Sequence, residues 1–198
     1  ADLPRITIRA PRNLQIDRSG AGSTEIGATE ALDVDFSGCG DATVGDVAGE
    51  LTIDLAGSGE ITVGAVRSLD IDLAGSGDIT VGAVAEGADV DIAGSGTVTI
   101  ASLTGELQTD SAGSGTVVVQ AGAITAANID LAGSGDVQIA APVQSLDVNI
   151  VGSGDVDVDA QVGEIDAEIA GPGNVRVASV TGAVRQQVWG PGSVTVGQ

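Results

Sequence analysis

Aliphatic and polar residues alternate along most of this chain. In the segment Leu51–Leu55, with the sequence LTIDL, every second residue is aliphatic and the residues between are polar. A period of two is typical of a β-strand with one buried face and one exposed face. A helix would have to accommodate a Gly every few residues, at about 1 kcal/mol each relative to Ala. The pattern therefore predicts strands along the whole chain.

A Gly-x-Gly triplet divides the chain into repeats of 18 to 20 residues. Its central residues are Ala21, Cys39, Ser58, Ser76, Ser95, Ser114, Ser134, Ser153, Pro172 and Pro191. When the repeats are aligned on these residues, the aliphatic positions fall into common columns, so that Leu32, Leu51 and Leu69 are equivalent. One repeat cannot bury its aliphatic face alone. Stacking each repeat on the next, about 4.8 Å away, buries all of these faces together.

The columns predict an all-β fold, a parallel β-helix (β-solenoid) of about ten coils with 18–20 residues each. The general rule for parallel crossovers favours right-handed winding, although the repeat length leaves a left-handed helix open. No insertion interrupts the series, so residues 1–198 are predicted to form a single β-helix domain. The triplets are predicted to be bends, where inward positions have no room for a side chain. A Gly-rich phosphate loop is the alternative, but it lacks the Lys and the strand-to-helix context that it needs.

The charge of the chain limits its partners. There are 28 acidic and 7 basic residues, and the formal net charge is −21. Such a charge disfavours nucleic acid and anionic membranes as partners. No apolar run is long enough to cross a bilayer, so no transmembrane segment is predicted. Cys39 is the only cysteine, which excludes an intramolecular disulfide.

Acidic residues form columns in the same alignment. The longest column lies four residues before the centre of each triplet and is expected to stack on one outer face. It consists of Asp17, Asp35, Asp54, Asp72, Asp91, Asp110, Asp130, Asn149, Glu168 and Gln187. A second column contains Asp33, Asp70, Asp89, Asp147 and Asp166, and a third contains Asp41, Glu60, Asp78, Asp136 and Asp155.

Two interpretations of these columns compete. Calcium binds several carboxylate oxygens at once, which makes the longest column a candidate metal site. The candidate ligands are Asp35, Asp54, Asp72, Asp91, Asp110 and Asp130. A charged face also keeps strands from pairing sideways, and this second interpretation is favoured because neither EF-hand nor nonapeptide calcium spacing is present. Calcium is thus the one candidate ligand, and no cofactor is predicted.

The recurring sequence Ala-Gly-Ser-Gly-Asp followed by alternating aliphatic residues, as in Ala74–Val81, resembles the bacterial auto-transporter adhesin head GIN domain family. The resemblance covers nearly the whole chain. It implies an exported bacterial β-helix, located at the cell surface, outside the cell or in the periplasm, with an adhesin-like role. It brings no catalytic residues. The two Pro-containing triplets and the absence of Lys and Tyr depart from the pattern expected of a typical member.

Other chemistry is less consistent with the sequence. Glycoside hydrolases use paired carboxylates, but these coils have no loops to build a cleft and the chain has no His, Lys or Tyr, so no enzyme is predicted. Thr43, Thr62, Thr80 and Thr99 align as in a flat ice-binding face, but other residues break the column. Cys39 replaces a Ser and is interpreted as a small side chain rather than a reactive thiol. Trp189 replaces an Ala and is a candidate end contact or binding anchor.

Two functions therefore remain. The first is a non-enzymatic adhesion or interaction module that binds a cell-surface ligand. The second is a structural subunit that self-assembles, end to end or laterally, into an extracellular filament or matrix. Self-association is favoured by open strand edges without a recognisable cap, by the basic N-terminal residues, and by a smooth outer alanine column. The basic residues are Arg5, Arg9, Arg12 and Arg18, and the column is Ala56, Ala74, Ala93, Ala112 and Ala132.

Overall fold

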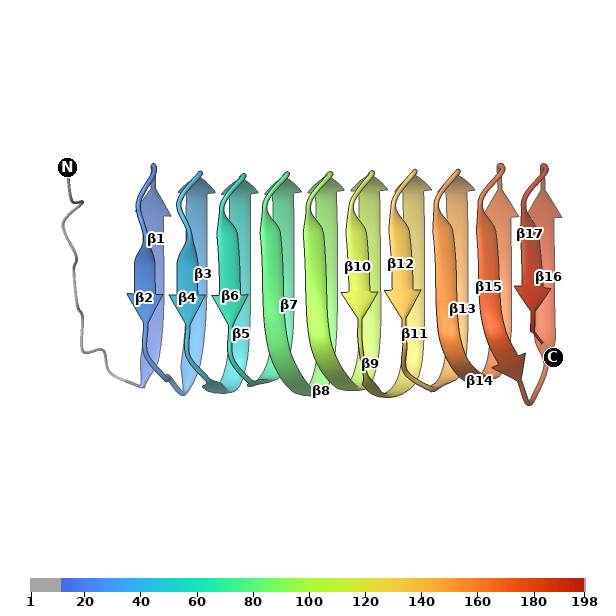
Figure 1. Ribbon diagram of the computed structural model, residues 1–198, viewed down its shortest axis with the longest axis horizontal. Helices are drawn as coiled ribbons and strands as arrows, with labels where there is room; N and C mark the ends of the chain where they lie inside the picture. The colour runs from blue at the N-terminus through green and yellow to red at the C-terminus, as the bar shows by residue number, and fades with distance from the viewer. Residues whose placement is uncertain (1–11, 198) are drawn as a thin grey trace.

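The fold is a flattened parallel β-solenoid. The computed structural model describes residues 12–197, and these form one continuous stack of coils (Figure 1). They contain 17 strands and no helix, and parallel pairings join all the strands into one sheet. The all-β parallel β-helix of about ten coils is therefore confirmed. The first aligned segment of the repeat, residues 5–10, lies outside the described residues.

The strands form two faces, called front and rear as they lie in Figure 1. The front face contains β2 (Thr24–Ile26), β4 (Ala42–Val44), β6 (Glu60–Val63), β10 (Thr116–Val119), β12 (Asp136–Ile139), β15 (Asn174–Val180) and β17 (Ser193–Val196). The rear face contains β1 (Asn13–Ser19), β3 (Ala31–Gly38), β5 (Val47–Gly57), β7 (Val66–Gly75), β11 (Gly122–Gly133), β13 (Val143–Gly152) and β16 (Val184–Trp189). Three long strands curve from the front face into the rear face, namely β8 (Asp78–Gly94), β9 (Thr97–Gly113) and β14 (Asp155–Ala170).

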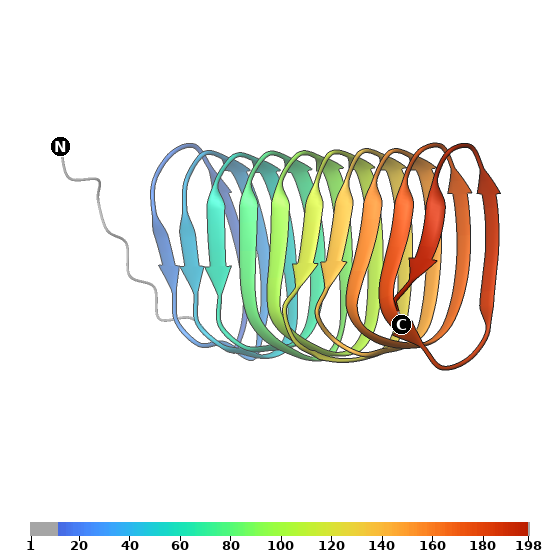
Figure 2. The ribbon, with the colours of Figure 1, turned by 45° about the vertical axis from the view of Figure 1, so that its right-hand side comes forward.

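The winding is right-handed. Figures 1 and 2 show each coil rising through the rear face, crossing at the top, and descending through the front face while the chain advances from β1 towards β17. The helix therefore turns and advances in the same sense, as the rule for parallel crossovers predicts.

The register follows the repeat. Each coil pairs with the next at equivalent positions, as Leu32 does with Leu51 and Leu51 with Leu69. The aliphatic columns point inward and are buried, with Ile53, Ile71 and Val90 fully shielded from solvent. Successive side chains of a strand point to opposite sides, so a shift of the pairing by one residue would turn the aliphatic side chains of that strand outward. The in-register stack is therefore strongly preferred.

The Gly-x-Gly triplets form the bends at the top of each coil, as predicted. Gly57, the first glycine of its triplet, has a φ of 144°, a conformation that side chains other than glycine rarely adopt. A Cβ atom on Gly59, the second glycine, would collide with the carbonyl oxygen of Gly40 in the preceding coil. The first glycine is thus required by the backbone conformation and the second by the close stacking of coils.

In the middle of the rear face, two inward positions of one coil depart from the aliphatic pattern. Thr109 and Ser111 are buried, and neither side-chain oxygen has a hydrogen-bond partner among the described residues. They occupy columns that contain Val90 and Ile92 in the preceding coil. One coil therefore has two unsatisfied hydroxyl groups in an interior that is mostly aliphatic.

In the first described coil, a charged side chain occupies one inward position of the rear face, in register with Phe36 of the next coil. Arg18 lies in an inward column, with its guanidinium 5.7 Å from the centre of the Phe36 ring. Its guanidinium nitrogens donate to the hydroxyl of Thr24, at 2.7 Å, and to the carbonyl oxygen of Gly22. Arg18 is therefore engaged within its own coil, while Arg12 forms an ion pair with Glu30. Arg5 and Arg9 lie outside the described residues.

Candidate functional site

The longest acidic column stacks on the outside of the rear face, and we call it the acidic ladder. Strand pairing joins each member to its equivalent in the next coil, from Asp17 with Asp35 to Glu168 with Gln187. Alternation creates this arrangement, because Asp54 stands between the buried Ile53 and Leu55 and must point outward. The stacking predicted from the sequence is therefore confirmed, with like charges about 4.8 Å apart along the axis.

Partial burial and neighbouring carboxylates make some acidic residues of the rear face harder to ionise. Partial burial raises the pKa of Asp54 to about 6, and neighbouring Asp72 and Asp35 contribute to the increase. Partial burial, followed by the negative charge of Asp110, also raises the pKa of Asp91. In the adjoining second column, burial and neighbouring carboxylates raise the pKa of Asp70, Asp89 and Asp147. At these positions of the rear face, the surroundings thus disfavour the negative charge of the carboxylates.

The structure brings two of the six predicted calcium ligands into one group. Carboxylate oxygens of Asp33, Asp35 and Asp54 lie within 4.8 Å of one another, so Asp33 of the second column joins the two predicted ligands. Asp72, Asp91, Asp110 and Asp130 belong to no such group among residues 12–197. Calcium takes six to eight oxygens, and three half-buried carboxylates would leave the remaining positions to water. Calcium binding stays a prediction.

A shallow groove runs beside the middle of the acidic ladder, and we call it the ladder groove. Its volume is about 570 Å³. Two adjoining outward columns line it over five coils, the carboxylates, which we call its wall, and the alanine methyl groups, which we call its floor. Its outward-pointing side chains are Asp72, Asp91, Asp110, Asp130, Asn149, Ala74, Ala93, Ala112, Ala132 and Val151. Val151 marks one end, and 65% of its surface is exposed, the largest value among the large hydrophobic residues described.

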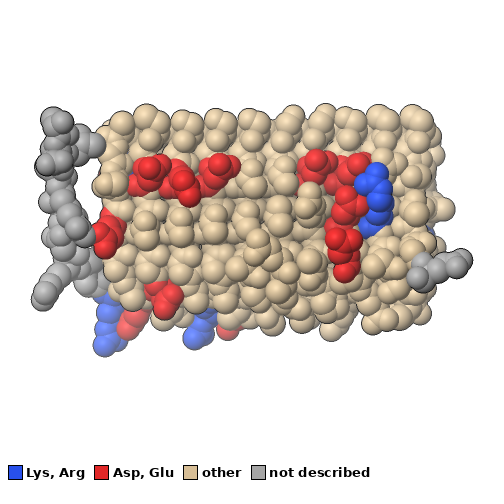
Figure 3. Space-filling view, viewed as in Figure 1, with Lys and Arg blue, Asp and Glu red and all other residues tan. Residues whose placement is uncertain are grey.

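The third acidic column lies on the front face and has a different role. Figure 3 shows this face, where acidic residues form an interrupted row among uncharged residues. Carboxylate oxygens of Asp41, Asp78 and Asp136 accept hydrogen bonds from backbone N–H groups of the following coil, at 3.2, 3.2 and 3.0 Å. These carboxylates therefore join neighbouring coils.

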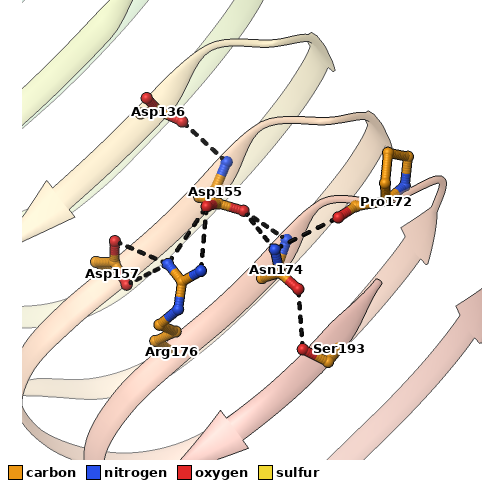
Figure 4. Close-up of polar contacts among 7 residues, drawn as sticks. All are labelled: Asp136, Asp155, Asp157, Pro172, Asn174, Arg176 and Ser193. Atoms are coloured by element: carbon orange, nitrogen blue, oxygen red, sulfur yellow. Dashed lines mark hydrogen bonds and ion pairs between the residues drawn. The ribbon is translucent and has the colours of Figure 1, made fainter. Parts of the chain in front are cut away.

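Near the C-terminal end, the front face contains a larger polar network (Figure 4). Asp155 accepts hydrogen bonds at 2.9 Å from both the backbone and the side chain of Asn174. The guanidinium of Arg176 lies 3.3 Å from Asp155 and 3.1 Å from Asp157. Partial burial acts to raise the pKa of Asp155, but the hydrogen bonds from Asn174 and the charge of Arg176 outweigh it, and the pKa lies below its ordinary value.

The remaining residues considered in the sequence analysis lie on the surface. Cys39 is exposed at its bend. Thr62 and Thr80 are exposed on the front face and pair in register, so the threonine column exists but is short. Trp189 is 57% exposed and continues the alanine column beyond Val151 and Ala170.

Two features of the site were not found from the sequence. The alanine column was recognised as a smooth strip, but not as the floor of a groove beside the ladder. The hydrogen bonds that the third column makes to the next coil were also missed, although the position of its carboxylates directly after each bend could have indicated them. A carboxylate at that position can reach a backbone N–H group of the next coil.

Comparison with known proteins gives a family match. The family model described as "Putative auto-transporter adhesin, head GIN domain" matches residues 5–85 and 83–180. No curated protein and no solved structure shows a significant similarity to the chain. Within the described residues, no helix is long and apolar enough to cross a membrane.

Proposed function

The chain belongs to the auto-transporter adhesin head GIN domain family, and from this premise we propose that it is a non-enzymatic adhesion module of a bacterial cell surface. The observation that carries the proposal is the acidic ladder with its groove, a regular and uncompensated surface on a rigid rod. A rigid scaffold that presents one repeated surface suits multivalent contact, in which many weak interactions add up.

The location that we propose is the bacterial envelope, at the cell surface, in the periplasm or as a secreted protein. The family description supports this location. The high content of acidic side chains on both faces is compatible with a solvated, exposed rod. The partner that we propose is a ligand on another surface, rather than nucleic acid, which the net charge of −21 repels.

Adhesion can be tested with microspheres coated with the protein and offered to bacterial cells and extracellular matrix. We expect saturable attachment that soluble protein blocks. The matched control is microspheres coated with an unrelated acidic protein of similar size and net charge. Attachment no greater than that of the control would contradict the proposal.

A second candidate function is lateral self-assembly into a filament or matrix. It is favoured by Val151 and Trp189, two exposed apolar residues in one outer column. Repulsion between acidic rods opposes it, so we expect assembly to increase with salt. Light scattering across a salt series tests this, with Val151→Ser plus Trp189→Ser as the variant. A monomer at every salt concentration would exclude self-assembly and leave adhesion.

A further inference from the structure

We propose that the ladder groove binds an extended, lysine-rich polypeptide segment of a partner protein. The inference rests on the proposed adhesive function and deepens it, because it names the chemistry of the partner. It is drawn from the groove wall, the groove floor, and the contrast between carboxylates on the two faces.

The carboxylates of the groove wall have no cationic or backbone partner. Among residues 12–197, no Arg lies within ion-pair distance of Asp72, Asp91, Asp110 or Asp130, and no backbone N–H group donates to them. A row of like charges without counter-charges attracts cations strongly. The wall therefore offers negative charge that the protein itself does not neutralise.

The front face shows that the fold can use carboxylates structurally. Asp41 and Asp78 point outward from the front face, and each accepts a backbone hydrogen bond from the next coil. The groove carboxylates make no such contribution, and their mutual repulsion opposes folding. Their position beside a hollow is then best explained by a ligand that supplies the missing positive charge.

The groove floor selects the shape of that ligand. The methyl groups of Ala74, Ala93 and Ala112 form an apolar strip directly beside the carboxylates. A lysine side chain has an apolar stem and a charged end, so its stem can lie on the strip while its ammonium group reaches the wall. Sugars are less well matched, because the groove contains no aromatic side chain and only Asn149 offers side-chain N–H donors.

The length of the groove favours a polypeptide over a small amine. The groove spans five coils, from Asp72 to Asn149, which is about 20 Å at the usual spacing between strands. An extended segment of about six to eight residues covers this distance. Several weak contacts along one chain then act together, which a single ammonium ion cannot achieve.

The test uses fluorescence anisotropy with the whole chain and a labelled peptide of about eight residues in which lysine and alanine alternate. We expect binding that weakens as salt increases, because exposed charge pairs are screened. In Asp91→Asn plus Asp110→Asn, the dissociation constant should rise about tenfold, which corresponds to about 1.4 kcal/mol. The matched control is Asp41→Asn plus Asp78→Asn, which removes the same charge from the front face and should change the constant less than about twofold.

A second variant separates the groove from general electrostatic attraction. Ala112→Glu adds a negative charge but fills the floor of the groove with a larger side chain. If the peptide lies in the groove, binding weakens although the net charge becomes more negative. Equal losses in the front and rear double variants, or tighter binding to Ala112→Glu, would overturn the proposal. Circular dichroism of each variant checks that the fold is retained.

Other occupants of the groove have distinct outcomes in the same experiment. Absence of peptide binding, with binding of a neutral N-acetylglucosamine oligomer that is lost in Asp91→Asn plus Asp110→Asn, would overturn the proposal in favour of a sugar. Failure of adhesion is also separable. If coated microspheres do not attach but the peptide binds in the groove, the adhesive function is contradicted and the groove assignment stands. If microspheres coated with Asp91→Asn plus Asp110→Asn attach as well as those coated with the unchanged protein, the groove assignment is contradicted and the adhesive function stands.

Discussion

Both faces of this solenoid carry acidic columns, a nearly continuous one on the rear face and an interrupted one on the front face, and their carboxylates behave differently. On the front face, Asp78 and Asp155 accept hydrogen bonds from the next coil, and Arg176 balances part of the charge. On the rear face, Asp91 and Asp110 lie beside one another and beside further carboxylates, and both line the groove. The contribution of an acidic column to stability therefore depends on which hydrogen-bond donors and cations lie around it.

The difference extends into the interior. Apart from Thr24 in the first described coil, the inward columns of the front face are aliphatic, as in Val98, Val117 and Val137. Beneath the ladder groove, the rear face contains the buried hydroxyls of Thr109 and Ser111. On the front face, outward carboxylates and inward aliphatic side chains thus both stabilise the stacking of coils. In the middle of the rear face, outward carboxylates repel one another and inward hydroxyls are unsatisfied.

The largest effect is expected from filling this interior defect. Ser111→Leu replaces an unsatisfied hydroxyl, whose burial costs about 1–3 kcal/mol, with a side chain that matches Ile92 and Leu131 in the adjacent coils. We expect a gain of about 2 kcal/mol in the free energy of unfolding, and a rise in Tm of about 4–8 °C. Thermal denaturation measures it. The control is Ser114→Leu at an exposed bend, which should give no gain. A loss of stability in Ser111→Leu would show that the interior has no room at this site.

Removing one carboxylate from each face should have opposite effects. Asp155→Ala breaks the contacts to Asn174 and Arg176, and we expect a loss of about 1 kcal/mol, discounted because the ion pair is partly exposed. Asp91→Ala removes a repelled charge and should stabilise the protein by a few tenths of a kcal/mol at low salt. Urea denaturation of the two variants compares them directly. Equal destabilisation by both variants would remove the distinction between the faces.

Titration with acid should separate the faces again. Because the pKa of Asp54 is raised to about 6, the folded protein binds more protons than the unfolded chain between about pH 4 and 6. Stability should therefore rise as the pH falls from 7 to 5, by less than the gain from Ser111→Leu. Below the ordinary Asp pKa of 3.8, protonation of Asp155, whose pKa is lowered, should reverse the trend. Tm measured against pH tests this, and Asp54→Asn should flatten the rise.

The smallest effect is expected from calcium. If calcium only relieves repulsion along the acidic ladder, sodium chloride at the same ionic strength should reproduce most of the rise in Tm. Asp72→Asn plus Asp91→Asn should reduce the response to both salts. A large rise specific to calcium, lost in this variant, would instead establish a calcium site on the ladder. Asp33→Asn plus Asp54→Asn tests the separate group that contains Asp35.

The sequence by itself determined the architecture and the register. Near-identical repeats bury their aliphatic columns when they stack in register, so that Leu32 lies on Leu51. The same periodicity placed Asp54, Asp72 and their equivalents in one outward ladder, and the recurring triplets marked the bends. Each of these features depends on the order of residue types, which is fully written in the chain.

Only the tertiary structure decided what each outward residue does. The bridging of coils by Asp78, the position of Arg18 over Phe36, and the hollow beside Ala112 all depend on side-chain direction and on distances of about 3–6 Å between coils. Residues that are equivalent in the alignment can then become hydrogen-bond partners, as Asn174 donates to Asp155. The repeat fixes which residues are neighbours, whereas the packed coils fix which atoms meet.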